Sequence, residues 1–396
     1  MNHVTSLDPN FSRAFDRLCR ERVASRAPAV DRAAAVPEDS WRDVVESGYL
    51  GLFHPRELGG SAADGATQFA AMESLAVACA STFWAATIST VLCGKLLHAL
   101  CGPRHHARWL RPIVAGAAIG CFAATERGAG SDPASYRTHV RADGDGYRLR
   151  GEKQKISNAT TADVAVVLAR REAPTSPELC YVVVDLRGPG IRRREQPKLG
   201  LRGMSWGTIE FDDVAVAAED VILGASVEKT LVSVEWGQLI QTMSALGLAR
   251  ASLAACREFV RERSAFGRPI AHLEAVHARV ADMQAEIDAA RALAREVVEL
   301  KAQGQSAREP VMMAKIFTTE MAVRVADRAM RCLGGSGYAA EQAIERLYRD
   351  SLANVPAGLP NDRLREFLGC AMVGVDPWTY PPFDWLGPAG LGVGEG

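Results

Sequence analysis

The sequence lacks several signals that would define a function class at once. Its 396 residues include 46 Lys and Arg against 47 Asp and Glu, a net charge of −1, so the basic excess typical of a nucleic-acid-binding protein is absent. The nine cysteines form no CxxC pair, which argues against a disulfide framework and a zinc or other metal site. The N-terminus, MNHVTSLDPNFSRAF, has no basic flank before an apolar run, so we expect no signal peptide.

A long uninterrupted hydrophobic run is also missing. The longest weakly polar stretch, ASTFWAATISTVLCGKLL at residues 80–97, contains several Ser and Thr and a lysine, which predicts a buried core helix and not a membrane span. Hydrophobic residues make up 48% and charged residues 23%, as in ordinary globular proteins. We therefore expect a cytoplasmic protein in a reducing compartment, with neither nucleic acid nor membrane as a partner.

The spacing of apolar residues along the chain changes from helical to strand-like and back, which predicts an α+β fold. Residues 1–120 carry apolar side chains at helical spacing and predict an N-terminal α-helical domain. Residues 121–226 contain short β-branched runs and the hairpin signal HVRADGDGYRLRGEK, typical of a small β-domain. Residues 227–380 return to long periodic helices and predict a four-helix bundle, and residues 381–396 predict an irregular tail.

Five sequence blocks occur in a particular order along this pattern. They are CFAATERGAGSD (121–132), GEKQKISNAT (151–160), LGLRGMSWGTIEFDDVAV (199–216), RERSAFGRPI (261–270) and LGGSGYAAEQAIERLYRD (333–350). Their order and spacing resemble the acyl-CoA dehydrogenase superfamily from about residue 40 to residue 372. The resemblance implies an FAD cofactor, an acyl thioester of coenzyme A or acyl carrier protein as partner, and a homodimer or homotetramer.

The first block has a physical reason to bind an anion. Its small residues let the backbone approach a bulky phosphate closely and offer N–H and hydroxyl donors. The resemblance implies that Thr125 and the backbone of Phe122 and Ala124 lie near the isoalloxazine ring. It implies that Gly130 and Ser131 lie near the pyrophosphate.

The other cofactor positions follow from the resemblance, with departures. Ser157 keeps the hydroxyl expected near flavin N5, whereas Lys155 replaces an aromatic residue and could offer only its aliphatic stem to the ring. Two further groups are implied to reach the flavin of a neighbouring subunit. They are Arg263 at the pyrophosphate with Phe266 in the same block, and Arg331, Gly334 and Gly335 at the adenine end. Ala265 stands where relatives have a polar contact.

The carboxylate that the resemblance calls for is missing. Relatives remove the α-proton of the thioester with a Glu, because a positioned base must accept it in the transition state. Counting without gaps from Arg349 into LANVPAGLPND, the position of this Glu falls at Gly358. If Gly358 is instead aligned with the Gly that follows the Glu in the family pattern, the position falls at Ala357. The family's second position for this Glu falls at Gly237, where a Gly inside a helix leaves room for a substrate or a shifted flavin.

The acids nearest to these positions are weak replacements. Glu235 is a base candidate, but its place in the pattern fits better with a contact to the pantetheine arm, beside Gln238 as a second substrate contact. Asp362 is the other base candidate and is also expected to begin the next helix as a capping acid. The catalytic base is therefore left unassigned.

Three functions remain open on this sequence. The first is an FAD-dependent oxidoreductase of specialised metabolism that acts on an acyl thioester, by CH–CH or alcohol oxidation, without the standard Glu. The second is a flavin monooxygenase of the same superfamily, which needs no such Glu because reduced flavin activates oxygen. The third is a non-redox protein that kept the fold and lost flavin, as the changes at Lys155, Ala265 and Arg331 would allow.

Overall fold

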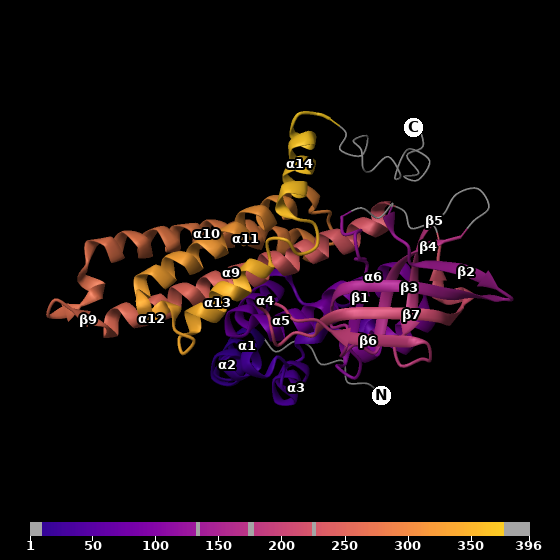
Figure 1. Ribbon diagram of the computed structural model, residues 1–396, viewed down its shortest axis with the longest axis horizontal. Helices are drawn as coiled ribbons and strands as arrows, with labels where there is room; N and C mark the ends of the chain where they lie inside the picture. Colours follow the sequence, from indigo (N-terminus) through magenta and orange to yellow (C-terminus); the bar gives the residue numbers. More distant parts are fainter. Residues whose placement is uncertain (1–9, 132–134, 173–177, 224–226, 376–396) are drawn as a thin grey trace.

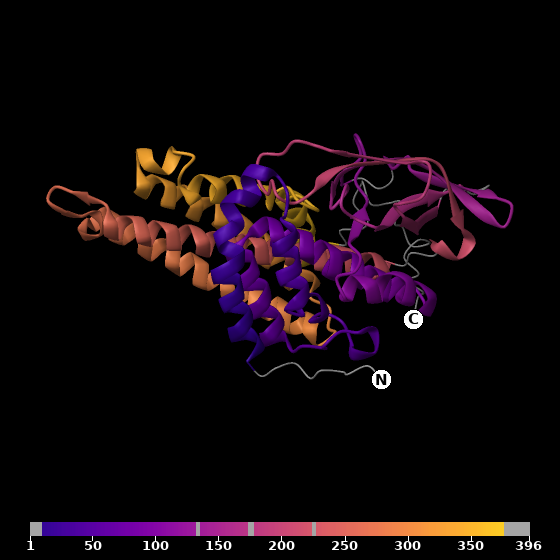
Figure 2. The same cartoon turned by 90° about the horizontal axis from the view of Figure 1, so that it is seen from below.

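The computed structural model describes residues 10–131, 135–172, 178–223 and 227–375, with the backbone only for residues 227–232 (Figure 1). The tail predicted for residues 381–396 lies outside this part of the chain. The described chain forms a helical N-terminal region, a β-sheet region and a helical C-terminal region, which confirms the predicted fold class. Figure 2 shows the sheet and the far end of the C-terminal helices at opposite ends of the molecule.

The N-terminal region packs helices against the long first helix of the C-terminal bundle. Its α-helices are α1 (Phe11–Leu18), α2 (Ala24–Ala33), α3 (Glu38–Glu46), α4 (Gly65–Ala78), α5 (Ala80–Thr87), α6 (Gly94–Leu100), α7 (Pro103–His105) and α8 (Arg111–Val114). Short π- or 3-10 segments join them: η1 (Cys19–Val23), η2 (Tyr49–Gly51), η3 (Arg56–Leu58), η4 (Ile88–Cys93) and η5 (His106–Leu110). Trp84 on α5 donates its indole N–H to Ser244 Oγ at 2.8 Å, which fastens this region to the bundle.

Two stretches are long and apolar enough to cross a membrane by length and composition, Ala80–Leu100 and Ser233–Glu262. In each, 78% of an 18-residue apolar window is buried inside the protein. In the first stretch, α5, η4 and α6 run on as one helix, and its side chains fill the main core. The prediction of a buried core helix at residues 80–97 is confirmed, because the apolar face that a lipid would cover is covered by protein.

The β-region is one twisted sheet in the strand order β6-β7-β3-β2-β4-β5-β8, with β1 paired to β4. Its strands are β1 (Gly120–Ala123), β2 (His139–Asp143), β3 (Gly146–Ser157), β4 (Val164–Arg171), β5 (Glu178–Asp185), β6 (Ile191–Glu195), β7 (Trp206–Ala217) and β8 (Val221–Ile222), with η7 (Ala218–Asp220) before β8. The predicted hairpin is present as β2 and β3, and Gly144 turns between them at a φ of 61°. A left-handed residue at this place suits glycine because it has no Cβ to clash.

The C-terminal region is a bundle of α9, α10, α11 and α13, with α14 packed against α11 (Figure 1). Its helices are α9 (Val227–Glu262), α10 (Glu274–Ala302), α11 (Arg308–Leu333), α12 (Gly335–Tyr338), α13 (Ala343–Ala353) and α14 (Asn361–Met372), with η8 (Ile270–His272) before α10. Gly247 lets α9 approach α4 closely, since a Cβ there would lie 2.4 Å from the Cβ of Ala76. Arg291 on α10 adds a two-pronged ion pair to Glu73 on α4, at 2.7 and 3.0 Å.

The sheet is joined to the bundle by the last of the five blocks. Asp350 on α13 is buried and accepts the N–H of Leu201, which precedes β7, at 2.5 Å. Burial raises the pKa of this carboxyl to about 6. The neighbouring Arg349 pairs with Asp31 at 2.7 Å and Glu345 at 2.8 Å. These two adjacent side chains fix the position of the sheet relative to both helical regions.

Candidate active site

The first block forms a loop that a buried ion pair holds in place. Glu126 accepts the backbone N–H groups of Arg137 at 2.6 Å and Thr138 at 3.0 Å, and pairs with Lys153 Nζ at 2.7 Å. Lys153 is fully buried and also donates to the carbonyl of Ala124 at 2.7 Å. Burial lowers the pKa of Lys153 to about 8, against the pull of Glu126. The sequence blocks did not single out this pair, although it shapes the loop that follows β1.

One side of this loop forms a wall beside the sheet that the described residues leave accessible. Thr125, Phe122 and Ala124 are half-buried, and the carbonyl of Thr125 accepts the N–H of Gln154 on β3 at 2.9 Å. A Cβ built at Gly130 would meet no described atom within 4 Å. Half-buried groups next to open backbone are what a flat, charged cofactor requires, so this loop fits the predicted flavin contacts on the ring and phosphate side.

The second block ends β3 with a bulge. Lys155 has a φ of 59° and is exposed, at the register shift between β3 and β7. Ser157 is half-buried and pairs with Trp206 of β7. The next residue, Asn158, has a φ of 63° and donates its side-chain N–H₂ to the carbonyls of Ala85 at 2.9 Å and Gly120 at 3.2 Å. Asn is one of the few residues that adopt this conformation readily, so its place after Ser157 was a usable signal that sequence reasoning missed.

The other predicted cofactor residues lie far from this wall. Arg263 precedes a small hairpin of β9 (Ser264–Ala265) and β10 (Arg268–Pro269), and both views place this hairpin and α12 at the bundle end remote from the sheet. Phe266 at its tip is 92% exposed, with a φ of 53°. Arg331 is exposed and pairs with Asp327 at 2.7 Å, and Gly334 has a φ of 58°. One chain therefore does not bring the two predicted groups together.

The loop between α13 and α14 contains the empty base position. Gly358 has a φ of 60°, and a Cβ built on it would lie 2.7 Å from Nε2 of Gln241 on α9. At Gly237, one helical turn before Gln241, a Cβ would meet no described atom within 4 Å. The two positions predicted for the Glu thus differ: at Gly358 a side chain would have to displace the Gln241 amide, and at Gly237 it would meet no described atom.

A buried lysine donates hydrogen bonds to this loop. Lys315 on α11 is fully buried and donates to the carbonyls of Val355 at 2.8 Å and Leu359 at 3.0 Å and to Oδ1 of Asn361 at 2.6 Å. Burial lowers the pKa of this ammonium group to about 7. All three N–H donors are used on one segment, so the loop conformation that carries Gly358 depends on Lys315.

Three buried amides near this loop carry unpaired atoms. Gln238 is 2% exposed and Gln241 is 4% exposed. Within the described part of the chain, both side-chain polar atoms of Gln238, Oε1 of Gln241 and Oδ1 of Asn354 have no hydrogen-bond partner. Buried polar groups are almost always paired in folded proteins. These atoms are therefore available to a bound ligand.

The carboxylate of Glu235 is bound by three groups of the protein. It pairs with Lys301 at the end of α10 and accepts the hydroxyl of Ser306 at 3.1 Å and the N–H of Ala307 at 3.3 Å. Ala307 is the N-cap residue of α11, so this carboxylate ties the α10–α11 turn to α9. The geometry argues against the predicted substrate and base roles of Glu235, because its oxygens are already bound by protein donors.

Asp362 is also unsuited to the predicted base role. Its side chain is 96% exposed and faces Arg365 at 3.4 Å. It lies in the first turn of α14, where an acid is favourable to the helix dipole, but the N-cap residue is Pro360 and no side chain caps the helix. The predicted capping bond is therefore absent from this described helix start.

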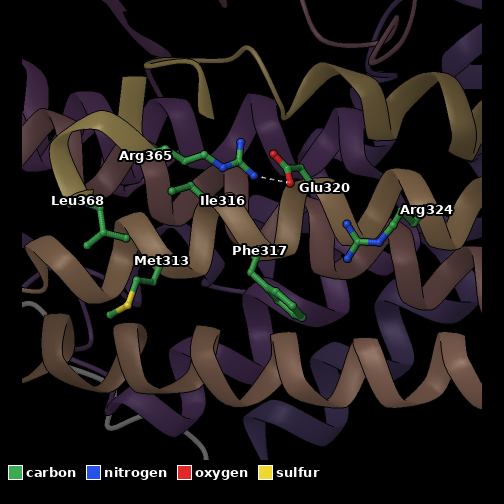
Figure 3. Close-up of a pocket in the computed structure, with 7 residues that line it drawn as sticks. All are labelled: Met313, Ile316, Phe317, Glu320, Arg324, Arg365 and Leu368. Atoms are coloured by element: carbon green, nitrogen blue, oxygen red, sulfur yellow. Dashed lines mark hydrogen bonds and ion pairs between the residues drawn. The ribbon is translucent and has the colours of Figure 1, made fainter. Parts of the chain in front are cut away.

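A separate groove lies between α11 and α14 (Figure 3). It has a volume of roughly 360 Å³ and is lined by Met313, Ile316, Phe317, Glu320, Arg324, Arg365 and Leu368. Glu320 and Arg365 form an ion pair across it at 2.7 Å. The lining contains none of the predicted site residues, so this groove is distinct from the loop at Gly358.

Comparison with known proteins agrees with the architecture. Family models of the acyl-CoA dehydrogenase N-terminal, middle and C-terminal domains match residues 9–117, 121–214 and 229–370. The chain belongs to the acyl-CoA dehydrogenase family. This acyl-CoA dehydrogenase homologue is 30% identical over 337 residues to the probable acyl-CoA dehydrogenase YngJ of Bacillus subtilis. The matched region covers 84% of this chain and 89% of that protein.

Solved structures give the same result. The glutaryl-coenzyme A dehydrogenase–glutaryl-CoA complex superposes with a TM-score of 0.89 at 25% identity, over 95% of this chain and 98% of the other. The prolyl acyl carrier protein oxidase AnaB superposes with a TM-score of 0.86 at 23% identity, over 92% and 98%. The second match shows the fold alone. The family consists of oxidoreductases, and the general enzyme class of this chain follows from it.

Proposed function

We propose that this acyl-CoA dehydrogenase homologue is an FAD-dependent oxidoreductase that acts on an acyl thioester without a glutamate base, in specialised metabolism. The observation that carries the proposal is the meeting of Gly358 with the amide of Gln241. A neutral amide cannot accept a proton from the α-carbon. Ordinary α,β-dehydrogenation of a saturated acyl chain therefore has no base at this position.

The residues present fit FAD. Thr125, Ser131 and Ser157 would hold the ring and pyrophosphate from one subunit, beside the open backbone at Gly130. When bound, the flavin would supply a two-electron acceptor for the substrate. The exposed Lys155 leaves the ring without the aromatic contact of relatives, so we expect weaker flavin retention than in an ordinary family member.

A second subunit would complete this site. Arg263 and Arg331 lie at the bundle end remote from the sheet, and there Phe266 is 92% and Tyr338 is 87% exposed. Large exposed aromatic side chains are typical of contact surfaces. We propose a homodimer or homotetramer in which this end reaches the flavin of a neighbour. Sedimentation velocity on the purified protein tests it, and a monomer that retains FAD would contradict it.

The thioester carrier is coenzyme A or an acyl carrier protein. One structural relative is named for a coenzyme A ester and another for a carrier protein, so the fold accommodates both. Oxidation at a carbon that bears a hydroxyl is the chemistry that this site supports best. There the hydride would leave the carbon for the flavin and the hydroxyl proton would pass to water, so no α-carbon base is required; a hydrogen-bonding amide would only orient the hydroxyl.

The test begins with the visible absorption spectrum of the purified protein. FAD in near-stoichiometric amount is expected, and anaerobic addition of a suitable hydroxyacyl thioester should bleach it. Colourless protein that does not take up added FAD would favour the non-redox alternative. Oxygen consumption that depends on a reduced nicotinamide, with no anaerobic bleaching, would favour the monooxygenase.

A further inference from the structure

We propose that Gln238 and Gln241 form a recognition site for a hydroxyl group on the acyl chain of the substrate. This inference rests on the proposed function and adds the class of acyl group. Both side chains project from α9, three residues apart, and residues at this spacing share one helix face. Gly237 stands one turn before Gln241 on the same face.

The unpaired atoms match a hydroxyl in kind. Gln238 offers a donor group, Nε2, and an acceptor, Oε1, and Gln241 offers the acceptor Oε1, all without a partner among the described residues. A hydroxyl donates one hydrogen bond and accepts others. It can therefore accept from Nε2 of Gln238 and donate to Oε1 of Gln241 at the same time. A plain alkyl chain at this place would leave these buried atoms unpaired.

The space for such a chain lies beside Gly237. A Cβ there would meet no described atom within 4 Å, although the next turn of α9 is packed, as Leu239 and Ile240 are fully buried. A larger residue at position 237 would project into this space. The glycine thus keeps the acyl chain within reach of the two amides.

The loop at Gly358 holds one of the amides in position. Nε2 of Gln241 lies 2.7 Å from the place of a Cβ on Gly358, so the amide rests against the loop backbone. Lys315 fixes that loop through Val355 and Leu359. Gln241 is therefore a specificity-determining residue whose orientation depends on the loop, and it does not act as a base.

The experiment compares binding of two sets of probes to the FAD-loaded, full-length protein. The probes are butyryl-CoA and its 2-, 3- and 4-hydroxy derivatives, with the same acyl groups on an acyl carrier protein. Binding is followed by perturbation of the flavin spectrum and by calorimetry. We expect one hydroxylated probe to bind at least about tenfold more tightly than the plain one, since a site built for a hydroxyl rejects the analogue without it.

Variants assign the preference to the amides. Gln238→Leu and Gln241→Leu should each lower the ratio of affinities to within about threefold, chiefly by weakening the hydroxylated probe. Gln241→Asn, which keeps the amide but shortens it, should lower the ratio partly and serves if the Leu variant does not fold. Gln284→Leu is the control, because Gln284 on α10 is exposed and its side-chain N–H₂ donates to Asp288 on the same helix at 3.1 Å.

The outcomes separate the two proposals. If plain and hydroxylated probes bind equally well, or if the preference survives in both Leu variants, the hydroxyl site is wrong while the proposed function stands. If no thioester in either set perturbs the flavin, the proposed function fails and the hydroxyl site fails with it.

Discussion

The backbone of Gly358 lies beside the side-chain amide of Gln241. A Cβ on Gly358 would lie 2.7 Å from Nε2 of Gln241, which is closer than non-bonded atoms approach, so any larger residue requires the amide to move. The φ of 60° at Gly358 adds a second reason for glycine. A side chain at position 358 would therefore need both a left-handed backbone and a shifted Gln241 amide.

This relationship predicts that positions 358 and 241 are energetically coupled. Gly358→Ala should lower the free energy of unfolding by about 1–2 kcal/mol through its left-handed backbone, and further through the collision with Gln241. In the background of Gln241→Ala the collision is gone, so the same change should cost less. Urea denaturation of the two single variants and the double variant measures the coupling. Strictly additive effects would show that the amide does not touch the glycine.

Glu235 is expected to matter for stability and not for substrate affinity. Glu235→Gln removes the charge that faces Lys301 and weakens the bonds to Ser306 and the N–H of Ala307. We expect a loss of about 1–3 kcal/mol in the free energy of unfolding, because Glu235 is buried. Asp362→Asn is the matched control, since that exposed acid should contribute less than about 0.5 kcal/mol.

A catalytic or substrate role for Glu235 would give a different result. A tenfold change in kcat or KM for Glu235→Gln, with the thermal midpoint unchanged, would contradict the structural assignment.

The lowered pKa of Lys315 predicts that the stability of the protein depends on pH. This pKa is lowered from 10.5 to about 7 in the folded state by burial, so the unfolded chain binds more protons between these values. The contribution of this residue to stability should therefore rise from pH 7 to about 10.5 and be constant below pH 7.

The variant Lys315→Met isolates this contribution. It removes three donors from the loop of Val355, Leu359 and Asn361, and should destabilise the protein at every pH. The difference in unfolding free energy between the two proteins should widen between pH 7 and 10, measured by denaturant titration. A difference that stays constant over this range would contradict a lowered pKa.

Arg263 is expected to contribute to flavin retention from outside the subunit that holds the ring. Arg263→Ala should lower the ratio of FAD to protein, since a charge-assisted phosphate contact is lost. Arg257→Ala, a change at an exposed arginine of the same helix region, is the control and should leave the ratio unchanged. Equal occupancy in both variants would remove Arg263 from the flavin site.

Subunit mixing extends this test. A variant weakened at Arg263 and another weakened at Ser131 should recover part of their FAD binding when refolded together, because each hybrid contains one intact site. No recovery in hybrids would mean that both residues serve the same chain.

The sequence predicted the architecture well where local patterns were strong. The hairpin of β2 and β3 follows from alternation and glycine turns, and the buried helix at residues 80–97 follows from its length and its Ser and Thr content. Such features depend on residues that are close in sequence, so the sequence alone can predict them. The five blocks likewise led to the family, which three domain matches support.

The roles of individual polar residues were harder to predict. Glu235 could not be seen to face Lys301, because the two lie 66 residues apart on different helices. The same holds for Lys315 and Val355 and for Glu126 and Lys153, whose buried partners come from other elements. Long-range partners depend on how the elements pack, and no local pattern reports them.

The sequence by itself determined the order of helices and strands, the family resemblance and the absence of a carboxylate at the two expected positions. Only the tertiary structure decided what stands there instead: an amide from α9 against Gly358, and open space beside Gly237. The reason is physical. A missing side chain can be read from the letters, but what fills its place depends on the packing of α9 against the loop that Lys315 holds.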